Sequence, residues 1–84
     1  MAYKILILRH AQKEMAELPV DAYQKVKLAI YKLAENPLPR GNIKLKGRDG
    51  WRIRVGEYRV VYEINNNEHI ITVIHTGHRR DIYR

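Results

Sequence analysis

The stretch "WRIRVGEYRVVY", residues 51–62, decides the fold, because it predicts two short strands joined by a two-residue turn at Gly56-Glu57. The pairs that face each other across this hairpin are then Val55 with Tyr58, Arg54 with Arg59, Ile53 with Val60 and Trp51 with Tyr62. Directly opposed residues share a face, so one face is apolar and aromatic, and the other holds Arg52, Arg54, Arg59 and Val61. Like charges opposed in this way destabilise a sheet. Three clustered guanidinium groups therefore predict a binding site for an anion.

Outside the hairpin, the hydrophobic pattern predicts one further strand before it, one after it, and two helices. The expected elements are a strand at 3–8, helices at 10–18 and 22–35, the hairpin strands at 51–55 and 58–64, and a strand at 69–76. The order β-α-α-β-β-β fits a small α+β domain, residues 1–84, in which an antiparallel sheet carries both helices on its apolar face. The arginine face is then expected to lie open.

Composition limits the class of protein. Eighty-four residues make one domain, and 45% hydrophobic residues exclude a disordered chain. No apolar run approaches the ~18 residues of a membrane span, and there are no cysteines, so we expect a soluble, cytoplasmic protein without membrane contact. The net charge is +7, of which residues 40–84, with ten basic and five acidic residues, carry +5. This excess points to nucleic acid or an acidic protein as the partner.

Further basic residues flank the hairpin. They are Lys44, Lys46 and Arg48 before it, in a Pro- and Gly-rich connection, and Arg79, Arg80 and Arg84 after the last strand. If these segments converge, they extend the anion site into a phosphate-binding surface for nucleic acid. The alternative is a solvated strand face with no ligand.

The C-terminal segment "TGHRRDIYR" combines a proton carrier, cations and an aromatic ring. His78, Arg79 and Tyr83 suit proton transfer, phosphate binding and base stacking respectively. The alternative is a frayed, charged terminus, although Ile82 and Tyr83 are unusual in one.

Metal binding is not expected from the sequence. His75, His78 and Asp81 lie three apart, but on a strand and loop that spacing has no fixed facing geometry. We also find no Gly-rich phosphate loop and no nucleophile beside a base, so no cofactor is predicted.

The second helix has residues outside its apolar arc. Gln24, Leu28 and Tyr31 are either scattered exposed side chains or a docking surface for a protein partner.

The runs "KLKGRDGWRIRVGEYRVVYEI" (residues 44–64) and "VIHTGHRRDIYR" (residues 73–84) resemble the RelE branch of the RelE/ParE toxin superfamily. The resemblance implies two helices on an antiparallel sheet, and a toxin of a type II toxin–antitoxin system that cuts messenger RNA in the ribosomal A site and inhibits translation. It also implies a cognate RelB-like antitoxin, whose acidic, partly disordered segment would suit a charge of +7. The expected docking surface for this antitoxin is either the second helix at Gln24, Leu28 and Tyr31 or the groove between the helices and the sheet.

The resemblance also implies residue roles. Arg52, Arg54 and Arg59 match the positions that hold the scissile phosphate. Arg79 matches the residue that protonates or stabilises the leaving oxygen, and Tyr83 matches the one that stacks on or orients the substrate.

The general base is not assigned by the resemblance. Some relatives carry a lysine on the first hairpin strand, whereas this chain has arginines there, and arginine does not lose its proton near neutral pH. His78 is the first candidate, because the ordinary histidine pKa of about 6.5 suits the task. Tyr83, a water molecule, or no strong base at all are the alternatives.

The expected reaction is attack of a ribose 2′-oxygen on the adjacent phosphate, which needs no metal. Three rival functions stay open. The first is a ParE-like toxin that poisons DNA gyrase, the second a non-catalytic nucleic-acid-binding module, and the third a toxin that has lost its activity.

Overall fold

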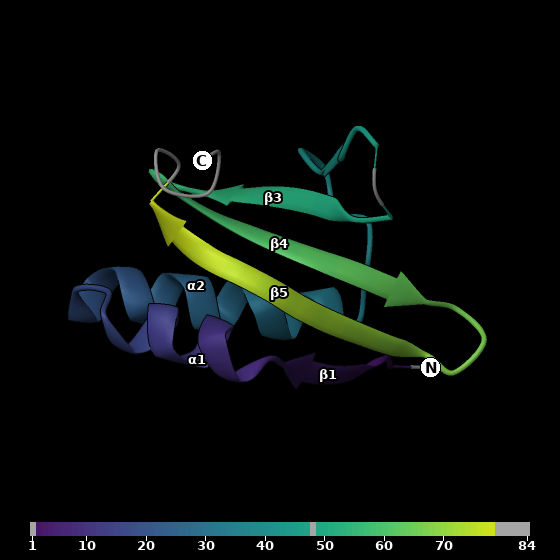
Figure 1. The fold of residues 1–84 in the computed structure, drawn as a ribbon, viewed down its shortest axis with the longest axis horizontal. Helices are drawn as coiled ribbons and strands as arrows, with labels where there is room; N and C mark the ends of the chain where they lie inside the picture. The colour runs from purple at the N-terminus through teal and green to yellow at the C-terminus, as the bar shows by residue number, and fades with distance from the viewer. Residues whose placement is uncertain (1, 48, 79–84) are drawn as a thin grey trace.

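The computed structural model describes residues 2–47 and 49–78, and Figure 1 shows their arrangement. The elements are β1 (Lys4–Ile7), α1 (Arg9–Ala16), α2 (Val20–Leu33), β2 (Ile43–Lys44), β3 (Trp51–Val55), β4 (Tyr58–Asn65) and β5 (Ile70–His78). The strands form one sheet in the order β1-β5-β4-β3-β2, and both helices lie on the same side of it. The predicted α+β fold is therefore confirmed.

Two features of the sheet differ from the prediction. β1 pairs with β5 in parallel, with Lys4 beside Ile70, so the sheet is mixed rather than wholly antiparallel. A parallel pair needs a long connection, and here α1, α2 and three strands separate the two partners along the chain. The second difference is β2, which adds two paired residues inside the segment expected to be an irregular loop.

The core lies between the helices and the covered face of the sheet. Its buried side chains come from α1 (Ala11, Met15), α2 (Val26, Ile30, Leu33), the hairpin (Ile53, Val60, Tyr62) and β5 (Ile71, Val73). The apolar face of residues 51–62 is thus the face that packs under the helices, as predicted. None of the described helices is both long and apolar enough to cross a membrane.

Tyr62 ties the loop after α2 to the core. Its side chain is 0% exposed, and its hydroxyl donates a hydrogen bond to the carbonyl oxygen of Pro37 at 2.7 Å. Burial raises the pKa of Tyr62 from 10.0 to about 12, because the ionised phenolate would be desolvated. The neutral form is therefore the one that the fold accommodates.

Tyr62→Phe should therefore change the response of stability to alkaline pH. Below pH 10 the variant is expected to be less stable by about 1 kcal/mol, because the bond to Pro37 is lost. Between pH 10.0 and about 12, unfolded Tyr62 ionises while folded Tyr62 does not, so the wild type loses stability as the pH rises. That loss approaches roughly 2–3 kcal/mol. Urea unfolding at a series of pH values should show that the wild type's advantage in unfolding free energy over Tyr62→Phe shrinks above pH 10 and then reverses in sign. A difference in unfolding free energy that stays constant with pH would contradict the account.

Candidate nucleic-acid interface

The hairpin register places the arginines as the sequence predicts. Arg54 pairs with Arg59 and Arg52 pairs with Val61, across antiparallel strands β3 and β4. We call Arg52, Arg54, Arg59 and Val61 the arginine face. It lies on the side of the sheet away from the helices (Figure 1), because the opposite face of the hairpin contributes Ile53, Val60 and Tyr62 to the core.

Exposure on the arginine face is uneven. Arg54 is exposed and Arg52 is half-buried, whereas Arg59 is only 6% exposed. The expectation of an open face thus fails at Arg59. It lies on the central strand β4, between Arg54 of β3 and Gly77 of β5, and its Nε and Nη1 atoms are buried.

This mixture of exposed and buried cations has a chemical consequence. Arginine keeps its charge when it is buried, and a desolvated guanidinium interacts more strongly with an anion than a solvated one does. The exposed Arg54 supplies hydrogen-bond donors within reach of solvent, directly opposite Arg59. The arginine face is therefore suited to a phosphate that contacts both strands of the hairpin.

Of the three cations expected before the hairpin, two are described. Lys44 lies on β2 opposite Trp51, with its Nζ 5.3 Å from the centre of the Trp51 ring and 3.9 Å from Oδ1 of Asp49. Lys46 is exposed beyond β2. By register, Ile43 rather than Lys44 is the β2 residue opposite Arg52. Arg48 lies outside the described residues.

Most of the predicted C-terminal site also lies outside the described residues. This group consists of Arg79, Arg80, Tyr83 and Arg84. β5 ends at His78, directly after Gly77, which pairs with Arg59. The described chain therefore ends beside the arginine pair.

His78, the candidate base, is described. It pairs with Tyr58, its ring meets the Tyr58 ring edge-on at 5.8 Å between centroids, and its Nε2 lies 3.9 Å from Oε2 of Glu57. Tyr58 belongs to the apolar face of the hairpin, so this register places His78 on the side opposite Arg54 and Arg59. These contacts do not bring His78 against the arginine face.

The second helix offers a separate apolar surface. Leu28 and Tyr31 are 56% and 53% exposed, and Gln24 is exposed as well. Tyr31 also lines a hollow of about 280 Å³ between α1, α2 and β1, whose walls include Ile7 and Met15. The hollow lies where the sequence analysis expected a groove between the helices and the sheet, but its lining residues come from three elements whose packing no local pattern specifies.

One side-chain cluster escaped the sequence analysis. His10 and Glu14 of α1 lie close to His75 of β5. The spacing of His10 and Glu14 places them on one side of a helix, but nothing local indicates that a residue of β5 joins them.

The fold and sequence match known toxins. The family model for the ParE toxin of the type II toxin–antitoxin system parDE matches residues 5–83. The RelE1 protein of Methanocaldococcus jannaschii is 30% identical over 88 residues, which cover 100% of this chain and 98% of that protein.

Two solved structures extend the likeness to three dimensions. The archaeal RelE–RelB complex of Pyrococcus horikoshii OT3 is similar with a TM-score of 0.83 and 30% identity, covering 94% of this chain and 97% of that one. The intact RelBE toxin–antitoxin complex of E. coli is similar with a TM-score of 0.80 and 28% identity, covering 92% and 96%. With the family model matching almost the whole chain, this protein belongs to the RelE/ParE family of type II toxin–antitoxin toxins.

Proposed function

We propose that this toxin is a ribosome-dependent endoribonuclease that cuts messenger RNA in the A site and thereby inhibits translation. The observation that carries the proposal is the pairing of Arg54 with Arg59, next to Arg52, on the sheet face away from the helices. Like charges in this position destabilise the sheet, and a bound phosphate offsets their repulsion. Membership of the RelE/ParE family supports the same function.

The proposed reaction is an intramolecular phosphoryl transfer. The ribose 2′-oxygen attacks the adjacent phosphorus and forms the P–O2′ bond, and the bond to the 5′-oxygen of the next nucleotide breaks. The products are a 2′,3′-cyclic phosphate and a 5′-hydroxyl, whose oxygen takes up a proton from water or from the group that accepted the proton of the 2′-hydroxyl. Arg52, Arg54 and Arg59 stabilise the negative charge that develops on the phosphoryl oxygens, Arg79 stabilises the leaving oxygen, and Tyr83 orients the substrate. Lys44, Lys46, Arg48, Arg80 and Arg84 are proposed to hold neighbouring RNA phosphates.

Charge stabilisation, rather than a strong base, is the proposed source of most of the acceleration. The arginines cannot accept the proton of the 2′-hydroxyl, and the register of His78 directs it to Tyr58 and Glu57. The ribosome would fix the in-line geometry, and the proton would pass to Tyr83 or water, with His78 as the alternative that His78→Ala tests. A small effect of His78→Ala on the cleavage rate agrees with this proposal, whereas complete loss in a folded variant would make His78 the base.

A messenger with a single 2′-deoxynucleotide at the cut site tests this chemistry. We expect no cleavage at that position, because the attacking oxygen is missing, while the all-ribose messenger is cut. The test maps 5′ ends on programmed ribosomes. Cleavage of the deoxy-substituted messenger at the same bond would exclude attack by the 2′-oxygen.

Gyrase poisoning is the second candidate function, because the matching family model bears the ParE name. A toxin of that kind would leave ribosome-bound messenger intact and would trap gyrase on cleaved DNA. Supercoiling and messenger-cleavage assays with the same preparation therefore separate the two candidates.

The proposed protein partner is an acidic, RelB-like antitoxin. The net charge of +7 favours an acidic segment, and the similar structures from P. horikoshii and E. coli are complexes with RelB. Exposed Leu28 and Tyr31, together with Gln24, are the proposed contacts on α2. Leu28→Ala combined with Tyr31→Ala is expected to weaken binding of the antitoxin by at least tenfold in calorimetry. If the double variant binds the antitoxin with unchanged affinity, the antitoxin docks on a surface other than this part of α2.

A further inference from the structure

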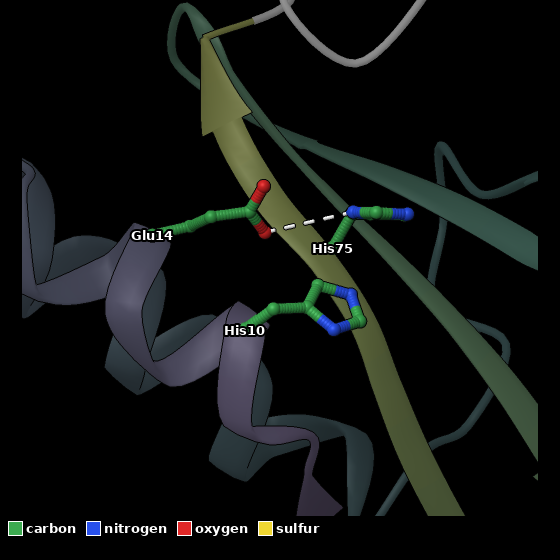
Figure 2. Close-up of side chains that lie close together, drawn as sticks. All are labelled: His10, Glu14 and His75. Carbon is green, nitrogen blue, oxygen red and sulfur yellow. Dashed lines mark ion pairs between the residues drawn. The ribbon is translucent and has the colours of Figure 1, made fainter.

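A histidine and a carboxylate on α1 meet a histidine on β5, two residues before the Gly77 that pairs with Arg59. His10 and Glu14 are one helical turn apart, and Figure 2 shows both directed toward His75. One ligand atom from each residue lies within 4.8 Å of the other two. Nδ1 of His75 is 3.6 Å from Oε1 of Glu14, and the rings of His10 and His75 are 4.8 Å apart between centroids.

The packing of α1 on β5 holds this cluster in place. β1 ends at Ile7, whereas β5 continues to His78, and α1 lies along that continuation. The backbone N–H of Thr76 donates to Oε1 of Glu14 at 3.1 Å, and its hydroxyl donates to the carbonyl oxygen of Ala11 at 3.2 Å. Thr76 is only 1% exposed, so both donors are held inside the fold. The Glu14 carboxylate therefore has a fixed orientation before any ligand arrives.

A β-bulge accounts for the position of His75. Val61 pairs with His75 but Tyr62 pairs with Val73, so Ile74 is the extra residue on β5. A bulge redirects side chains by breaking the regular alternation of the strand. Here Thr76 points into the core, while the neighbouring His75 remains half-exposed beside α1.

We propose that His10, Glu14 and His75 bind a Zn²⁺ ion. Two imidazole nitrogens and one carboxylate oxygen are ligands that zinc prefers, and three protein ligands leave the fourth tetrahedral position for water. Tetrahedral zinc with bonds near 2.0–2.1 Å places its ligand atoms about 3.3 Å apart. The contact between His75 and Glu14 is already close to that value at 3.6 Å, and exposed His10 has room to move inward.

None of the three proposed zinc ligands takes part in the proposed cleavage reaction. Zinc would link α1 to the part of β5 that extends past β1, and would stabilise the folded toxin by binding it in preference to the unfolded chain. The sequence alone had associated His75 with His78 and Asp81, which gave no geometry for a metal. The fold instead supplies a helix with two ligands at the correct spacing.

The test is zinc titration of the purified full chain without a polyhistidine tag. Calorimetry is expected to show one Zn²⁺ per chain with a Kd in the micromolar range or tighter. Excess zinc should raise the Tm by several degrees, and EDTA should reverse the shift. Mg²⁺ at the same concentration should have no effect, because histidine is a poor ligand for it.

Variants assign the ligands. His10→Ala and Glu14→Gln should each weaken zinc binding at least tenfold, and neither change empties a buried position. His69→Ala is the matched control, because His69 is an exposed histidine that stacks on Tyr3 instead, and its zinc binding should equal that of the wild type. The proposal is overturned if the wild type shows no zinc-dependent Tm shift, or if His10→Ala binds zinc as well as His69→Ala does. In either case the cluster is only an ion pair between Glu14 and His75.

Discussion

Arg54→Ala is expected to lower the rate of messenger cleavage on programmed ribosomes by about 100-fold or more, while the free energy of unfolding stays the same or rises slightly. Arg54 is exposed, so its removal leaves no cavity. It also lies directly opposite Arg59, so its removal relieves a repulsion between like charges worth roughly 0.2–1 kcal/mol. Loss of activity with no loss of stability is the signature of a residue kept for its ligand.

Two further variants make this prediction specific. Arg40→Ala removes an exposed arginine from the loop before β2 and should leave cleavage within about twofold of the wild type. Arg54→Lys keeps the charge but loses the forked set of donors, so its rate should fall between those of the wild type and Arg54→Ala. Equal cleavage rates for the wild type and Arg54→Ala would show that Arg54 does not take part in cleavage. A marked fall in the unfolding free energy of Arg54→Ala would give the arginine pair a structural role instead.

Ile30→Ala is expected to reduce the free energy of unfolding by about 2–5 kcal/mol. Ile30 is 0% exposed and belongs to the core cluster that joins α2 to β3, β4 and β5. Alanine leaves a cavity there that close-packed neighbours can fill only in part. The free energy of unfolding of a typical domain is about 5–15 kcal/mol, so this single change removes a large fraction of the stability.

Leu28→Ala is the matched control on the same helix. Leu28 is 56% exposed, so the change should alter the unfolding free energy by no more than about 0.5 kcal/mol in urea denaturation. Similar losses for the two variants would contradict the assignment of the buried face of α2.

The hairpin was predictable because its information is local. Gly56 adopts a positive φ of 62° in the turn, which glycine tolerates without strain, and the two-residue loop then sets every pair across β3 and β4. The opposed pair of Arg54 and Arg59 follows from that register alone. The buried arc of α2 was predictable for the same reason, since Val26, Ile30 and Leu33 recur at helical spacing.

What the sequence could not specify depends on contacts between distant segments. The parallel pairing of β1 with β5 brings together elements at opposite ends of the chain, and no local pattern distinguishes it from an antiparallel edge. The hairpin likewise does not specify the second neighbour of Arg59, which is Gly77 of β5. The cluster of His10, Glu14 and His75 needs both the docking of α1 and a bulge in β5. Residues 79–84, where the sequence predicts four of the catalytic and RNA-binding residues, lie outside the described residues.

The most direct test of the nuclease function is to map 5′ ends on a defined messenger incubated with the wild-type protein, with and without ribosomes, with Arg79→Ala in parallel. The account predicts discrete cuts at the A-site codon only when ribosomes are present, and their loss in the variant. An intact messenger, from a preparation of the wild-type protein that still stops cell growth, would contradict the nuclease function and make gyrase the next target to test.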